Sequence, residues 1–204
     1  AEACARVYEE ALPSMRGEAA LPLLRELADW AERHLSDRAR AVAALERARA
    51  LDPGDLSALS ALRRLHRAAG RWAELYQACA EAGARSGAAA ERAEAWREAA
   101  GVAETRLSDP ERAAEAWRRC LEADPADAEA AAALERLYLQ LDRPEDLAWA
   151  LERRRGASGQ RDPETAFRLA EIRRARLDDP AGALSLLSEI VRADPSHAGA
   201  LESL

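Results

Sequence analysis

The pair Asp-Pro recurs in this chain at a fixed long spacing, and this recurrence constrains the fold more than any other feature. Asp52-Pro53, Asp124-Pro125 and Asp194-Pro195 are 72 and then 70 residues apart. A second set of turn residues, beginning at Ser36, Ser108 and Asp178, follows the same two steps. Two independent sets in one register indicate an internal repeat. Such a repeat is typical of stacked arrays rather than of one globular core.

The composition predicts helices. Ala, Leu, Glu and Arg dominate the chain, and all four are strong helix formers, whereas aromatic residues make up only 4% of it. Lys and Asn are absent, so all 30 basic residues are arginine. The codon bias of a GC-rich bacterial genome explains this better than selection for guanidinium chemistry. The net charge of −7, with acids and bases interleaved, argues against nucleic acid as a partner.

Each step of about 70 residues is predicted to contain two helical hairpins. In the central unit, apolar residues at helical spacing predict a helix over 88–107. Asp109 is expected to cap the next helix, and Pro110 to occupy its first position. Short linkers make neighbouring helices antiparallel, and helices of about 15 residues cannot bury both faces alone. Odd-numbered hairpins carry one extra residue, which the sequence places between their helices around Ser108-Asp109.

We expect a single array over 1–204 that looks like a segment of a longer one, because the pattern is already running at both ends. The expected elements are a lead-in helix at 1–14, hairpins at 19–51, 55–84, 88–123, 127–157 and 162–193, and a partial sixth at 196–204. The least helical stretches are predicted to be Gly83–Gly87 and Gly156–Pro163.

These residues resemble the tetratricopeptide repeat (TPR) family, as degenerate repeats with a two-hairpin period. The third hairpin matches the family pattern at Trp96, Ala99, Ala100, Ala113, Trp117, Cys120 and Pro125. The even hairpins depart from it, because Arg63 and Glu135 stand where the family has a small residue. The resemblance implies an all-α fold, a right-handed α-solenoid of antiparallel helical hairpins that forms a superhelix.

In that family the first helix of each hairpin lines a concave groove, which predicts the partner-binding residues. They are Arg25, Asp29, Ser60, Arg64, Arg67, Arg97, Arg136, Gln140, Phe167, Glu171 and Arg174. Arginine outnumbers acid at these positions although the whole chain is acidic. We therefore expect a protein–protein interaction scaffold whose groove binds an extended or helical segment with acidic groups. The family's carboxylate clamp relies on Lys and Asn, which are both absent, so its usual partner is not expected.

An alternative function is a structural spacer or self-association segment of a larger protein, with end-to-end contacts between copies. Trp149 marks a second candidate surface, on the convex side, because the equivalent sites in other second helices are small or polar. It is either a partner anchor or a ring that packs onto the Pro144 turn or the next hairpin.

The chain offers no pattern that predicts an enzyme, a metal site or a cofactor. His34, His66 and His197 do not have the spacing of metal ligands, and His66 is expected to be a packed ring. The glycines do not form a phosphate loop or a nucleophile elbow. Cys4, Cys79 and Cys120 are expected to be buried free thiols, which suits a reducing, cytoplasmic compartment. No apolar run is long enough to span a membrane.

Overall fold

The computed structural model describes residues 2–15, 17–157 and 162–204. These residues form helices and turns, with no strand among them, so the predicted all-α fold is confirmed. The chain divides into two compact units, Ala1–Val102 and Ala103–Leu204. We describe each unit by itself. The reading of 1–204 as a single array stays a prediction.

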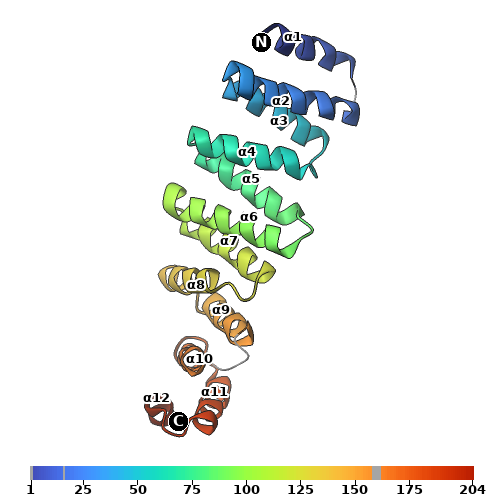
Figure 1. Ribbon diagram of the computed structural model, residues 1–204. Helices are drawn as coiled ribbons and strands as arrows, with labels where there is room; N and C mark the ends of the chain where they lie inside the picture. Colours follow the sequence, from blue (N-terminus) through green and yellow to red (C-terminus); the bar gives the residue numbers. More distant parts are fainter. Residues whose placement is uncertain (1, 16, 158–161) are drawn as a thin grey trace. The chain divides into compact units, whose positions relative to one another are not determined.

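In the first unit, each helix packs on the one that follows it along the chain. Figure 1 shows these helices as successive antiparallel pairs after α1. Their bounds are α1 Glu2–Ala11, η1 Leu12–Ser14, η2 Gly17–Ala20, α2 Leu21–Leu35, α3 Arg38–Leu51, α4 Leu56–Ala69, α5 Trp72–Arg85 and α6 Ala89–Val102.

The second unit repeats this arrangement, with consecutive helices in contact from η3 through α12. It begins with a π-helical turn, η3. The bounds are η3 Ala103–Leu107, α7 Pro110–Ala123, α8 Ala128–Gln140, α9 Pro144–Ala157, α10 Pro163–Arg176, α11 Pro180–Ala193 and α12 Ala198–Ser203.

An aspartate at the N-cap begins half of the α-helices in the described part of the chain. Asp109 accepts the amide hydrogen of Arg112 at 3.0 Å, which confirms the predicted cap of α7. The cap satisfies a backbone donor that has no partner inside the helix. The same contact, at 2.8–3.1 Å, starts five other helices, at Asp37, Asp55, Asp127, Asp162 and Asp179.

Two kinds of turn join the helices and explain the extra residue of the odd hairpins. At the end of α4 the amide of Arg71 donates to the carbonyl of His66, five residues back. At the end of α2 the amide of Asp37 donates to the carbonyl of Ala31, six residues back. The extra residue therefore lies in a widened last turn of the first helix and not in the linker, where the sequence placed it. At η3 this widened turn is π-helical, which is how a helix accommodates one inserted residue.

One predicted break in helicity is wrong in part. Helix α5 runs to Arg85, so the break predicted from Gly83 begins only at Ser86. Gly83 is a helical residue that lies against the ring of Trp96, where a Cβ atom would come within 2.6 Å of Trp96 Nε1. A close approach of helix and ring therefore explains this glycine. In the other predicted break, α9 continues to Ala157, and residues 158–161 lie outside the described part.

Each helix buries one face rich in alanine and leucine. In α7 the ring of Trp117 is almost fully buried, with 5% of the residue exposed, and its Nε1 donates to Glu104 at 3.3 Å. Trp149 in α9 is only half-buried. The two tryptophans should therefore contribute very differently to stability.

Replacing Trp117 with Ala should lower the free energy of unfolding by about 3–5 kcal/mol, because it leaves a large cavity in the core. The matched substitution of Trp149 should cost less than about 2 kcal/mol, since its ring is only half-buried and lies against the guanidinium groups of Arg118 and Arg153. Urea unfolding followed by far-UV circular dichroism measures both. Equal losses would show that Trp149 belongs to the core.

Candidate functional site

The predicted groove residues lie on the first helices of the hairpins, and the structure brings three of them together in the first unit. Arg25, Asp29 and Arg64 line one cavity of about 160 Å³ between α2 and α4. Its remaining lining residues are Ala28, Glu32, Leu45, Ser57, Ala58 and Ala61. We call this the α2–α4 groove. It has an apolar floor and a charged rim.

The two arginines of the α2–α4 groove already have partners within the chain. Arg25 donates from Nε and Nη2 to one oxygen of Asp55, at 2.8 and 2.7 Å. Arg64 forms a bidentate pair with Glu32. Each guanidinium has five N–H donors and uses two of them here, which leaves three for another acceptor. The arginine side chains remain 45% and 58% exposed, so a ligand can reach these donors.

Pairing with arginine also keeps two acids ionised, Glu32 in the rim of the groove and Asp55 beneath it. The hydrogen bond from Arg64 lowers the pKa of Glu32, against the opposing effect of burial. Burial of Asp55 favours its neutral form. Hydrogen bonds from Ser57, Ala58 and Arg25 outweigh it, however, and hold the pKa of this carboxyl below its usual value. Both acids are therefore ionised at neutral pH, and the rim of the groove is close to neutral as a whole.

Pairs of this kind connect consecutive hairpins in both units. The partners lie about one hairpin apart in the sequence, and a guanidinium of one hairpin pairs with a carboxylate of a neighbouring hairpin. Further examples are Arg49–Glu81, Arg63–Glu98, Arg67–Glu98, Arg136–Glu104, Arg155–Glu189, Arg168–Glu135 and Arg176–Asp142. The sequence could not reveal this use of arginine, because each partner lies some 30 residues away.

Glu98 accepts two arginines at once and, after Asp55, is the most enclosed of the acids in the first-unit pairs named above. It accepts hydrogen bonds from Arg63 and Arg67 of α4, and its side chain is 17% exposed. Burial opposes its charge, but the two guanidinium groups keep its pKa lowered. The buried Cys79 thiol lies beside this cluster, where burial and then Glu98 raise its pKa to about 12. Cys79 is therefore an unreactive thiol at neutral pH.

In the second unit the predicted groove residues lie in different surroundings. Arg136 pairs with Glu104, and Arg174 donates to the backbone oxygen of Ser203 at 3.4 Å. Phe167 is half-buried against the ring of His197, with 5.5 Å between ring centroids. Gln140 and Glu171 are exposed. Of the residues predicted in the first unit, Ser60 and Arg67 are exposed on α4, and Arg97 is partly exposed on α6.

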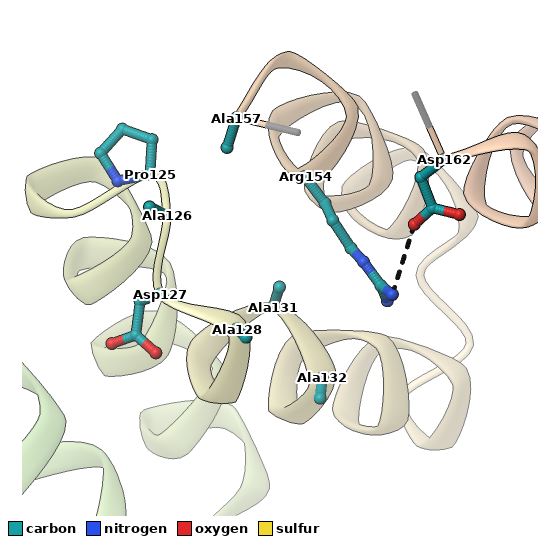
Figure 2. A pocket seen from close by; sticks show the side chains of 9 residues that line it. All are labelled: Pro125, Ala126, Asp127, Ala128, Ala131, Ala132, Arg154, Ala157 and Asp162. Carbon is teal, nitrogen blue, oxygen red and sulfur yellow. Dashed lines mark ion pairs between the residues drawn. The ribbon is translucent and has the colours of Figure 1, made fainter. Parts of the chain in front are cut away.

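A larger cavity of about 420 Å³ lies among α8, α9 and the start of α10 (Figure 2). We call it the α8–α10 cavity. Arg154 lies on one side of it and pairs with Asp162, at 3.5 Å, and with Glu135, at 3.1 Å. Its other lining residues are Pro125, Ala126, Asp127, Ala128, Ala131, Ala132 and Ala157. The sequence missed this cavity, because a run of alanines in an alanine-rich chain gives no signal.

Trp149 lies under two arginines of the second unit. The guanidinium of Arg118 is 4.3 Å from the centroid of its ring, and that of Arg153 is 5.5 Å away. Arg118 comes from α7 and also pairs with Asp146 at 2.7 Å. The ring thus contacts the preceding hairpin through a cation–π contact, a geometry that the sequence did not predict. Its role as a partner anchor stays a prediction.

The histidines and cysteines occupy structural positions. His66 is buried, as expected, and His197 caps α12 by accepting the amide hydrogen of Ala200 at 3.1 Å. The expectation that all three cysteines are buried is wrong for Cys4, which is exposed on α1. No group of three or more His, Cys, Asp or Glu able to hold a metal is found within the described residues. Within the same residues, no helix has the length and apolar character needed to cross a membrane.

Solved structures that are similar to this chain include the following three. YrrB, a TPR protein with an unusual peptide-binding site, matches over 98% of both chains at 15% identity, with a TM-score of 0.43. PilF of Pseudomonas aeruginosa covers 98% of this chain and 95% of its own at 17% identity and a TM-score of 0.40. TTC0263, a thermophilic TPR protein of Thermus thermophilus, covers 89% and 95% at 20% identity and a TM-score of 0.35. No family model and no curated protein matches the sequence.

The resemblance of this chain to tetratricopeptide repeats is one of local architecture. Within each unit it rests on the chain's own hairpins, with capped helices of about 14 residues that pack on their neighbours in order.

Replacing Glu98 with Gln should lower the free energy of unfolding by about 1.5–3 kcal/mol, the usual range for hydrogen bonds to a charged group. The substitution leaves two guanidinium groups on α4 without their shared carboxylate. Glu122 gives the control, because it also pairs with two arginines, Arg118 and Arg119, but within its own helix and with its side chain 35% exposed. Glu122→Gln should therefore cost less than about 1 kcal/mol. Urea unfolding compares the two variants, and equal losses would contradict a special role for Glu98.

His66 should make stability depend on pH. Burial lowers its pKa, although Glu46 on α3 and Glu74 on α5 act against this, while Arg71 and Arg49 add to it. The unfolded chain therefore binds a proton more readily than the folded one. The stability from neutral His66 is present above the unfolded pKa of about 6.5 and is lost as the pH falls through that value.

The test compares the urea midpoint at pH 7.5 and 5.5. The unaltered chain should lose stability over this range, whereas His66→Phe, which keeps a ring that cannot titrate, should lose less. The same pH dependence in both proteins would show that another group is responsible.

Proposed function

We propose that this chain is a protein–protein interaction scaffold, and that the α2–α4 groove binds a partner segment carrying an acidic group next to an apolar side chain. The observation that carries the proposal is a pair of exposed guanidinium groups above an apolar floor. Each group still has unused N–H donors. Arg25 and Arg64 stand on the rim, and Ala28, Leu45 and Ala58 lie beneath them. Binding, not catalysis, is the role we infer.

The charge arrangement favours a single carboxylate over a more highly charged ligand. Asp29 and Glu32 share the rim with the two arginines, so an approaching anion meets both signs of charge. A carboxylate can accept from the unused N–H groups of Arg25 or Arg64 without displacing Asp55 or Glu32. The fixed planes of these groups make the contact directional. Specificity is then set by the apolar neighbour that fills the floor of the groove.

The proposal predicts the kind of segment that the full chain selects from a random 12-residue peptide library displayed on phage. The selected peptides should combine Asp or Glu with a nearby apolar residue. Replacing Arg25 and Arg64 with Gln should weaken their binding at least about tenfold, measured by fluorescence anisotropy. Gln keeps hydrogen-bonding capacity and adds no negative charge.

Arg49→Gln is the matched control. Arg49 also joins consecutive hairpins, through Glu81 at 2.5 Å, but it lies on a second helix and not in the groove. It should leave binding unchanged. Selection of no peptide, of peptides without acids, or an equal effect of Arg49→Gln would overturn the proposal.

A further inference from the structure

At one position of the repeat, the side chain on the first helix of a hairpin lies near the N-cap residue of the first helix of the next hairpin. Arg25 occupies it in α2 and pairs with Asp55, the N-cap of α4, 30 residues on. In α10 the corresponding residue is Phe167, whose ring lies against His197, the N-cap of α12. Phe167 also packs closely on Gly199, where a Cβ atom would lie 3.0 Å from the ring. A long side chain thus fills the space between consecutive first helices at both places.

In α8 the same position is Ala132, and the corresponding N-cap is Asp162 of α10. The methyl group of Ala132 is too short to reach across, and both residues line the α8–α10 cavity (Figure 2). The cavity of about 420 Å³ compares with about 160 Å³ in the α2–α4 groove, where Arg25 is present. Arg154 supplies a guanidinium to Asp162 from α9 instead. The cavity therefore coincides with a missing large side chain.

The chemistry of the walls shows what can fill it. Methyl groups of Ala128, Ala131 and Ala157 and the ring of Pro125 provide apolar surface. The acids are already satisfied: Asp127 accepts from Ala130 and from the Cys120 thiol. Asp162 accepts from the amide and hydroxyl of Thr165, whose hydroxyl is the main cause of its lowered pKa. A ligand therefore gains mainly by burying apolar area, for which aromatic rings offer most per residue.

We propose that the α8–α10 cavity is a docking pocket for an aromatic side chain of a partner segment. The ligand ring does there what Phe167 does one hairpin later within the chain. Arg154, with its side chain 42% exposed, lies at the rim and can stack on the ring, as Arg118 stacks on Trp149. This inference rests on the proposed function, because it adds a docking pocket for partner segments within the second unit.

The test uses the full chain with ¹³C-labelled alanine methyl groups and N-acetyl-phenylalaninamide as the probe. Titration should give saturable shifts at the methyl groups of Ala128, Ala131, Ala132 and Ala157, with affinity in the millimolar range. N-acetyl-alaninamide, which lacks the ring, should give none. Absence of saturable shifts at these methyl groups, or equal shifts with the alanine probe, overturns the proposal.

Variants at the repeated position locate the effect. Ala132→Phe fills the cavity from within and should weaken probe binding at least about tenfold. Ala132→Arg should also weaken probe binding, because the new arginine can make with Asp162 the contact that Arg25 makes with Asp55. Ser60→Phe is the matched control, because Ser60 occupies the corresponding position of α4. It should leave the shifts unchanged.

Unchanged probe binding in both Ala132 variants overturns the pocket, and circular dichroism confirms that each variant is folded. The outcome is independent of the peptide selection. A pocket that binds the probe in a chain whose peptides ignore Arg25 and Arg64 contradicts the proposed function alone. Peptides that depend on Arg25 and Arg64, selected by a chain that does not bind the probe, contradict only the pocket.

Discussion

Each short helix must bury one apolar face against its neighbours, and the rest of this structure depends on that constraint. Helices of about 14 residues have little stability alone, so the alanine and leucine faces of consecutive helices pack together in sequence order. Small alanines allow close approach, and Gly83 extends the principle by admitting the ring of Trp96. The aspartate N-caps and the left-handed residues at the turns, such as Ser36 and Gly70, then fix where each helix starts and where the chain reverses.

Once the apolar faces are in contact, charged side chains at their borders meet from neighbouring hairpins. The arginines therefore connect neighbouring hairpins. Arg63 and Arg67 of α4 pair with Glu98 of α6, so Arg63, which departs from the family pattern, becomes an ion-paired contact between hairpins. On the rim of the α2–α4 groove, Arg25 and Arg64 are held in place by their own partners. Their side chains remain 45% and 58% exposed, and a guanidinium that is already held in place loses less entropy when a ligand binds.

The repeated position at Arg25, Ala132 and Phe167 shows how one architecture can give different surfaces. The backbone relation is the same in each case, 30 residues from this position to the N-cap that it faces. An arginine makes a charged bridge there, a phenylalanine makes an apolar wedge, and an alanine leaves a cavity. Substitution at one position thus changes the chemistry of the groove without changing the fold.

The sequence by itself determined the features that depend on neighbouring residues: the helical composition, the caps such as Asp109, the burial of Trp117, and the period of about 70 residues. It also placed Arg25, Asp29 and Arg64 on one face. It could not place the extra residue of the odd hairpins, because a widened helical turn and a longer linker have the same sequence length. Only the tertiary structure decided which acid each arginine pairs with, how Arg118 covers Trp149, and where Ala132 leaves a cavity. These contacts join side chains some 30 residues apart, which come together only after the helices have packed. A local sequence pattern cannot predict them.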